Sequence, residues 1–236
     1  MKLAASALVI VAAMLVLATG SSAATRECDG LQVCVPIAGP WVVVPTAASV
    51  PRPQVEYYVT CPRNYVVGGL DAELSRRAID IGFLGQLGSP VNPGITTSRA
   101  AVFLASYVGT GARGPTFRPH IGCMPATGGG GRVPTAATAP AAFPPGQPTV
   151  RRVRTVRVRP GSARVTASCR AGERLVGAAH AYGFFMRRPP TASLVSSISG
   201  SRSVSGSRVV VNVRGDAELN GVRAVVQVQA VCAGVR

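Results

Sequence analysis

Six cysteines have the most distinctive chemistry in this 236-residue sequence. Thiolates could hold a metal ion, but structural zinc sites are usually built from close pairs such as Cys-x-x-Cys, and no such spacing occurs. The two histidines, His120 and His180, lie far apart in the chain and do not complete such a site. An even number of cysteines without metal-binding spacing instead indicates disulfides, which form in exported proteins. We expect neither a metal ion nor a cofactor.

Arginine is the second source of chemistry, because its guanidinium group donates paired hydrogen bonds to carboxylates and phosphates. Residues 148–236 hold 15 arginines against 3 acidic residues, whereas residues 25–147 hold 9 against 6. Five arginines alternate with valines in "VRRVRTVRVRP": Arg151, Arg152, Arg154, Arg157 and Arg159. A strand here would turn valines to the core and guanidinium groups to solvent, with a bulge or break near Thr155, where the alternation slips. These five arginines are the predicted polyanion-binding residues, and a solvated strand face that binds nothing is the alternative.

Patterns typical of catalytic sites are sparse. A Ser-His-Asp hydrolase needs a base beside its nucleophile, yet neither His120 nor His180 lies near a Gly-x-Ser-x-Gly turn. Asp71 and Glu73 could act as a carboxylate pair, but alternation places both on the outer side of one strand, without a second acidic cluster. A phosphate-binding loop needs a lysine, and none follows Lys2. We therefore expect no enzymatic activity and no catalytic residues.

The first 24 residues indicate export. Lys2 precedes an uncharged apolar run that ends in small residues, as in a cleaved secretory signal peptide. The run is shorter than the roughly 20 residues that span a bilayer. We expect a signal peptide over 1–24 and a secreted, extracellular protein, either free or associated with the cell envelope.

The elements that carry these residues are predicted to be strands, because apolar residues recur at every second position and nowhere persist at helical spacing. In "GVRAVVQVQAVC" one parity is apolar, whereas Arg223, Gln227 and Gln229 share the other. We expect one buried and one exposed face there. Four cysteines fall in phase with the apolar residues before them and should point inward: Cys61, Cys123, Cys169 and Cys232.

The spacing of the cysteines selects one of the 15 pairings that six cysteines allow. Two of the inward cysteines are 62 positions apart and the other two are 63 apart, so each pair brackets an equivalent segment. The two remaining cysteines lie close together near the N-terminus. We predict three bridges: Cys28–Cys34, Cys61–Cys123 and Cys169–Cys232.

The sequence also contains two similar halves. "WVVVPTAASVPRPQVEYYVTC" aligns without gaps with "TVRRVRTVRVRPGSARVTASC", which indicates an internal duplication. We predict an all-β protein with two tandem, disulfide-bridged, antiparallel β-sandwich-like domains, each able to fold alone. The predicted organisation after the signal peptide is an N-terminal segment with the short disulfide over 25–40, a first repeat over 41–124, a Gly/Pro/Ala-rich linker over 125–148 and a basic second repeat over 149–236.

The motifs "CPRNYVVGGL" and "CRAGERLVGAA" begin equivalent segments of the two repeats. We interpret their paired small residues as structural, since glycine permits a positive φ or a close backbone approach at a bulge. With the closing "VQAVCAG", they resemble a β-domain of secreted proteins from high-GC bacteria, whose pattern is Cys-Pro-x-Gly, then paired glycines, then Ala-x-Cys. The resemblance covers residues 41–124 and 149–233 and implies an exported β-domain without an assigned function. The chain departs from the pattern at Asn64, after Cys169 and in "HIGCMP", so the resemblance implies no ligand.

These observations favour a secreted, non-catalytic protein, structural or weakly adhesive, with a basic second repeat. Its expected partners outside a cell are anionic wall polymers, acidic polysaccharide or lipid head groups. Nucleic acid is not expected, because the second repeat offers few aromatic residues for stacking: Tyr182, Phe184 and Phe185. A cell-wall-directed hydrolase with an unrecognised site and a secreted protein-binding toxin or inhibitor are the alternatives.

Overall fold

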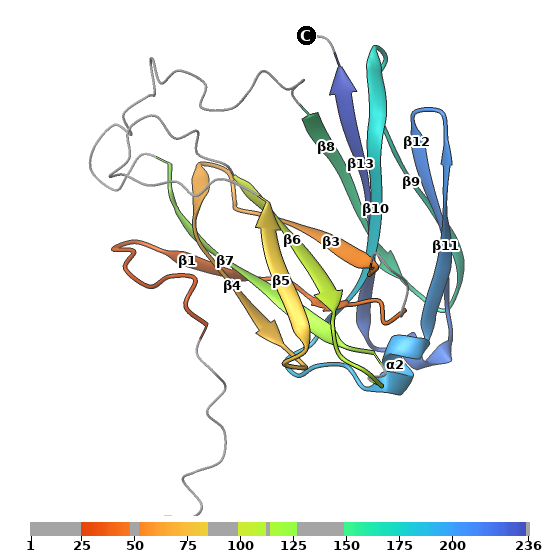
Figure 1. Cartoon of the computed structure of the whole chain (residues 1–236), viewed down its shortest axis with the longest axis horizontal. Coiled ribbons are helices and arrows are strands. Elements are labelled where there is room, and N and C mark those ends of the chain that lie inside the picture. Colours follow the sequence, from red (N-terminus) through yellow and green to blue (C-terminus); the bar gives the residue numbers. More distant parts are fainter. Residues whose placement is uncertain (1–24, 48–51, 85–98, 112–113, 127–148, 235–236) are drawn as a thin grey trace, which may run out of the picture.

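The prediction of an all-β protein is confirmed by a computed structural model of the chain (Figure 1). The structure describes residues 25–47, 52–84, 99–111, 114–126 and 149–234, so the expected signal peptide and most of the expected linker lie outside the described residues. Apart from strands, the described residues form only a five-residue helix, α2 (Ala192–Ser196), and a single 3-10 turn, η1 (Ala217–Leu219).

The first half forms two antiparallel layers. Its strands are β1 (Val35–Ala38), β2 (Trp41–Val43), β3 (Gln54–Thr60), β4 (Tyr65–Leu74), β5 (Ile79–Leu84), β6 (Ala100–Tyr107) and β7 (Thr116–Pro125). One layer has the order β4-β7-β2. Strand β1 lies end to end with β2, and both pair with the same edge of β7. The other layer has the order β3-β6-β5.

The second half has the same strand order. Its strands are β8 (Thr149–Val158), β9 (Gly161–Ser168), β10 (Glu173–Phe185), β11 (Ile198–Ser205), β12 (Arg208–Gly215) and β13 (Arg223–Gly234). One layer is β10-β13-β8 and the other is β9-β12-β11. The strands of the two halves therefore correspond in order: β8 to β13 occupy the same positions in the second half as β2 to β7 occupy in the first.

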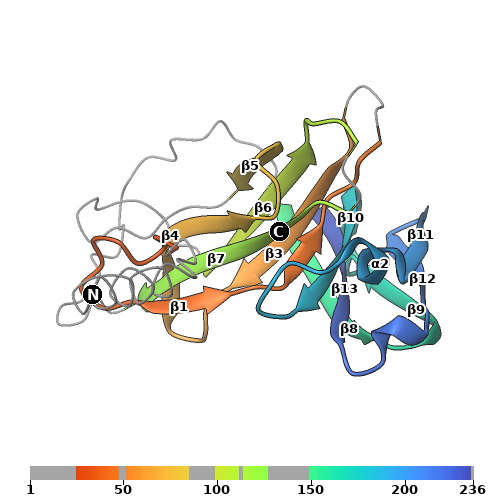
Figure 2. The same ribbon diagram turned by 90° about the horizontal axis from the view of Figure 1, so that it is seen from below.

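The two halves meet through one continuous sheet. Strand β2 pairs with β7 on one side and with β10 on the other, where Val42 lies opposite Gly183 and Trp41 opposite Phe184. The layers β4-β7-β2 and β10-β13-β8 thus form a single sheet across the molecule, and Figure 2 shows the two halves side by side. The halves are joined by backbone hydrogen bonds as well as by the chain, and independent folding of each stays a prediction.

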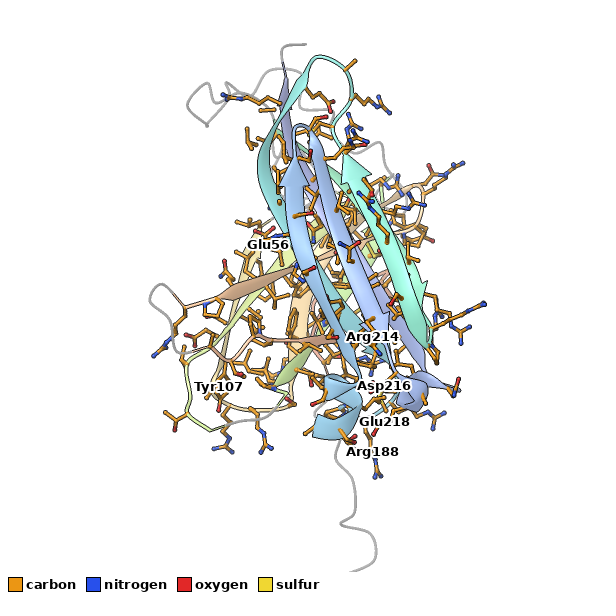
Figure 3. The ribbon with its side chains drawn as sticks, turned by 90° about the vertical axis from the view of Figure 1, so that its right-hand side faces the viewer. Glu56, Tyr107, Arg188, Arg214, Asp216 and Glu218 are labelled. Atoms are coloured by element: carbon orange, nitrogen blue, oxygen red, sulfur yellow. A yellow bond between two sulfur atoms is a disulfide. The ribbon has the colours of Figure 1, made fainter. Side chains whose placement is uncertain are left out.

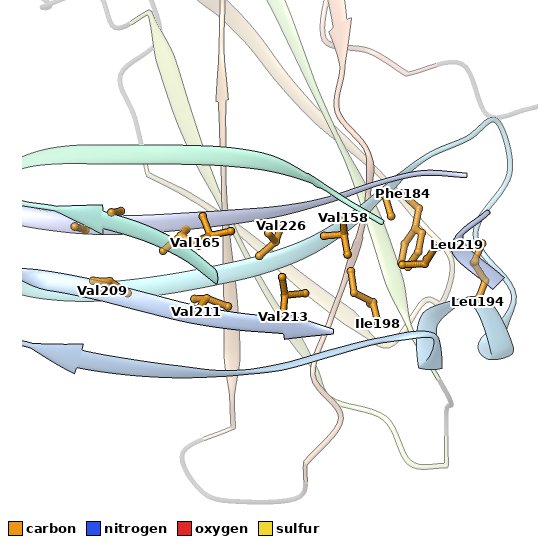
Figure 4. Packing of buried hydrophobic residues seen from close by; sticks show 14 of the residues in the cluster. Val158, Val165, Phe184, Leu194, Ile198, Val209, Val211, Val213, Leu219 and Val226 are labelled. Atoms are coloured by element: carbon orange, nitrogen blue, oxygen red, sulfur yellow. The ribbon is translucent and has the colours of Figure 1, made fainter. Parts of the chain in front are cut away.

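Each half has its own apolar core, because alternate residues of both layers face each other, as Figure 4 shows for the second half. In the second half, valines of β9, β12 and β13 meet Phe184 of β10, and Leu194 of α2 and Leu219 of η1 close one end. In the first half, the stacked rings of Phe103 and Phe117 lie 6.4 Å apart between β6 and β7. Ala181 of β10 belongs to the first-half core, so the cores touch at the shared sheet.

All three predicted disulfides are present. Their Cα–Cα distances are 5.7 Å for Cys28–Cys34, 5.7 Å for Cys61–Cys123 and 5.6 Å for Cys169–Cys232. The four cysteines of the two long bridges are buried, as their phase predicts. Each long bridge ties one layer of its half to the other and stabilises the fold by about 4 kcal/mol on the loop-entropy account, against about 2 kcal/mol for the short bridge.

The glycine motifs have a structural role. A bulge separates Val67 from Gly69 in β4, and another separates Leu175 from Gly177 in β10. A Cβ atom on Gly69 or on Gly122 would overlap the carbonyl oxygen of Glu27. The glycines of "VVGG" and its neighbouring strand therefore let the N-terminal segment lie directly on the outer face of β4 and β7.

Candidate functional site

The arginine-rich segment forms β8, the last strand of the shared sheet. Its pairing with β13 runs from Thr149 to Val158 without a register shift, so the predicted break near Thr155 is wrong. With regular alternation, Arg152 and Arg154 lie on the core side with Val156 and Val158. The core side of β8 is less deeply buried at its start than at its end, since Val150 is 37% exposed and Val158 is 2% exposed, and the arginines lie toward the exposed start.

The remaining arginines of this segment lie elsewhere. Arg151 and Arg157 lie on the opposite face of β8, and Arg159 lies beyond its end. The five arginines therefore do not form the single solvent-facing row that the sequence predicts.

Arg151 connects the two halves. Its Nη1 donates to Glu56 Oε2 of β3 and, over 2.9 Å, to Gln229 Oε1 of β13. The guanidinium side chain is 20% exposed and the Glu56 side chain 28% exposed. This arginine is thus committed to an internal ion pair.

Arg152 is also paired, within the second half. Its Nε donates to Glu173 Oε2 over 2.8 Å and its Nη2 donates to Glu173 Oε1, which makes a bidentate contact. The hydrogen bond from Arg152, with another from the Arg170 backbone N–H, lowers the pKa of Glu173 to about 2. The carboxylate stays charged in all but strongly acidic solution.

Three arginines of the predicted set are free to meet a ligand. Arg154, Arg157 and Arg159 are exposed, and within the described part of the chain none of their side chains makes a hydrogen bond or an ion pair. The structure thus divides the predicted set into two arginines used internally and three that face solvent.

The prediction that Gln227 and Gln229 lie on a wet face is wrong, since both are buried. Gln227 Oε1 accepts from the Tyr58 N–H over 2.7 Å, and Gln227 Nε2 donates to the Tyr58 carbonyl over 3.0 Å. Gln229 Nε2 donates to the Glu56 carbonyl over 3.1 Å. These two side chains pair with the backbone edge of β3, which would otherwise be unpaired.

A second charged group lies on the outer face of the first half. His120 of β7 has Nε2 2.9 Å from Glu73 Oε1 and Nδ1 3.5 Å from Glu27 Oε1, while Arg118 lies 3.8 Å from Glu73. Asp71 accepts from the Arg26 backbone N–H over 2.7 Å. Asp71 and Glu73 do share the outer face of one strand, as alternation predicts.

An imidazole between two carboxylates could relay a proton, but substrate has no access to this one. His120 is 5% exposed and Glu27 is 4% exposed, since the Glu27 backbone lies directly against Gly69 and Gly122 on this face. The geometry favours a fastening role, in which the group holds the N-terminal segment against β4 and β7. Sequence reasoning missed Glu27 as a partner because nothing in the local pattern places that segment over His120.

One further cluster has donor atoms close enough for a metal ion. Cys169, Glu173 and Cys232 present ligand atoms within 4.8 Å of one another. The two sulfurs form a disulfide and the Glu173 carboxylate accepts hydrogen bonds from Arg152. The cluster therefore offers a metal ion neither thiolates nor a free carboxylate.

No family model, curated protein or solved structure matches the chain. Within the residues that the structure describes, no helix has the length and apolar character needed to cross a bilayer.

Proposed function

We propose that this is a non-catalytic protein, structural or weakly adhesive, that binds anionic polymers through its basic second half. The observation that carries the proposal is that the second half has exposed arginines whose side chains have no internal partner, among them Arg154, Arg157 and Arg159 of the predicted set. They belong to a half whose 15 arginines greatly outnumber its 3 acidic residues.

The physical basis of such binding is electrostatic. A surface with a large excess of one charge attracts polymers of the opposite charge, and each contact releases counterions from the polymer. Arginine adds geometric complementarity, because its planar fork matches carboxylate and phosphate groups. Binding of this kind weakens steeply as salt is added.

We also propose that the protein is exported, with residues 1–24 as its signal peptide. The three disulfides support this, since disulfides persist mainly in oxidising compartments. The natural partners would then be anionic wall polymers, acidic polysaccharide or lipid head groups.

We further propose that the two halves arose by duplication. Their matching strand orders, equivalent bulges and equivalent bridges support this. On this account the second half kept the scaffold and gained positive charge, while the first half received the covering N-terminal segment.

The test is retention of the whole chain on purified cell envelope at two salt concentrations. We expect retention at low salt and release at high salt. Absence of retention at low salt would overturn the proposal, and so would retention that resists salt. Release of soluble wall fragments during the incubation would instead support a hydrolase.

A further inference from the structure

A second sheet face carries the features expected of a ligand surface. The layer β11-β12-β9 turns one side to the core and the other side to solvent, and Figure 3 views this solvent side. Its pairings run without a register shift, so the outward side chains form straight rows across the three strands. The outward positions are Ser199, Ser201, Ser203 and Ser205 on β11, Arg208, Val210, Asn212 and Arg214 on β12, and Ser162, Arg164, Thr166 and Ser168 on β9. We call this set the serine–arginine face.

Nearly all of the serine–arginine face is polar and accessible. Ten of its side chains are exposed, Thr166 is half-buried, and the only apolar member, Val210, is covered by its neighbours. Within the described residues, no side chain of the face makes a hydrogen bond or an ion pair. The hydroxyl, amide and guanidinium groups are therefore free to bind a ligand.

The charge on this face is entirely positive. It carries Arg164, Arg208 and Arg214, and acidic residues begin only past the end of β12, at Asp216 and Glu218 (Figure 3). Arg208 and Arg214 are six residues apart on one strand, which separates their Cα atoms by about 20 Å. A shallow hollow of about 310 Å³ lies at the Arg214 end, between Arg164 and Arg214.

The shape and chemistry of the face exclude most occupants. It has no exposed apolar residue to bury, so another protein would gain little hydrophobic free energy there. A second copy of the chain would place like charges opposite each other. The outer face of the other layer, β10-β13-β8, is by contrast already in contact with β3 through Gln227 and Gln229. A long, hydrophilic, anionic ligand is complementary to what remains.

We propose that the serine–arginine face binds a linear acidic polysaccharide. The arginines pair with its carboxylates, and the serine and threonine hydroxyls with Asn212 exchange hydrogen bonds with its sugar hydroxyls. The rows of hydroxyl groups favour a polymer made of sugars, because they would add little binding free energy to an anionic polymer that has no sugar hydroxyls. The inference rests on the proposed polyanion binding and assigns it to a face other than β8.

Two variants matched in charge test the assignment. One replaces the face arginines, Arg164→Gln, Arg208→Gln and Arg214→Gln. The other replaces the free arginines of the β8 region, Arg154→Gln, Arg157→Gln and Arg159→Gln. Both remove three positive charges from exposed positions without internal partners, and thermal melting verifies that each variant folds. The probe is polygalacturonate, which has one carboxylate on each sugar, with polyglutamate and neutral dextran for comparison.

The face variant is expected to bind polygalacturonate more weakly by on the order of tenfold or more at low salt, with a shallower salt dependence. The β8 variant should lose much less of its affinity for polygalacturonate. Equal losses in the two variants, or a larger loss in the β8 variant, would overturn the inference while leaving polyanion binding intact. Failure of the unaltered chain to bind either polyanion would overturn the proposed function itself.

The hydroxyl rows need a separate variant. Ser201→Ala with Ser203→Ala removes two hydroxyls from the middle of β11 and leaves the charge unchanged. Weaker binding to polygalacturonate with unchanged binding to polyglutamate is the expected result. An equal effect on both polymers, or no effect on either, would contradict a role for the hydroxyls in recognising a sugar chain.

Discussion

The side-chain amide of Gln227 forms two hydrogen bonds with the backbone of Tyr58, 169 positions earlier in the chain. The amide accepts from the Tyr58 N–H and donates to the Tyr58 carbonyl, as a neighbouring strand would. A glutamine side chain that projects from the face of β13 thereby satisfies the backbone groups at the edge of the sheet to which β3 belongs. This contact connects the two halves without extending either β ladder.

Replacing Gln227 with alanine should destabilise the protein by about 2 kcal/mol or more, because it leaves the N–H and C=O groups of Tyr58 without partners in a part-buried setting. Urea unfolding at neutral pH measures this. Gln54→Ala is the control, since Gln54 is exposed at the start of β3. A change of less than about 0.5 kcal/mol in the Gln227 variant would show that water replaces the amide.

The second half alone, residues 149–236, should unfold cooperatively, because it has its own core and its own long disulfide. We expect a lower melting temperature than that of the whole chain, since separation exposes Gln227, Gln229 and Ala181. Calorimetry measures both. Absence of a cooperative transition in the isolated half would show that the shared sheet is essential for its folding.

Acid should weaken the contact between Arg152 and Glu173. The pKa of Glu173 is about 2 in the folded state, against a usual value near 4.5, so its contribution to stability is complete above pH about 4.5. That contribution is lost as the pH falls from about 4.5 through 2. Glu173→Gln should therefore lose less stability than the unaltered chain over this range. Parallel curves of stability against pH for the two proteins would contradict the shifted pKa.

The buried group around His120 should hold the N-terminal segment in place. His120→Ala removes the side chain that contacts both Glu27 and Glu73, and we expect faster trypsin cleavage after Arg26 and faster amide hydrogen exchange in residues 25–34. His180→Ala is the matched control, because His180 lies in β10 of the other half. Unchanged cleavage and exchange in the His120 variant would assign the fastening to the Gly69 and Gly122 contacts alone.

Period-two alternation predicted the class of the fold and the inward direction of four cysteines, because it reports which side of a strand is apolar. The equal spacing of those cysteines then predicted all three disulfides. It mistook Gln227 and Gln229 for exposed residues, since alternation distinguishes polar from apolar and cannot detect a strand from the other half lying on the polar side. It also placed a break in β8, where the strand is in fact regular and two arginines lie on the core side at its more exposed start. The serine–arginine face depends on the register of three strands, which no single segment encodes.

Free arginines of the second half are proposed to bind polyanions. The most direct measurement is the affinity of the whole chain for polygalacturonate as a function of salt, compared with a variant in which Arg154, Arg157, Arg159, Arg164, Arg208 and Arg214 are all glutamine. We predict that the affinity of the unaltered chain falls steeply with salt and that the variant, though folded, binds weakly and with a nearly flat salt dependence. Equal affinity of the two proteins at every salt concentration would show that these six arginines do not bind the polymer.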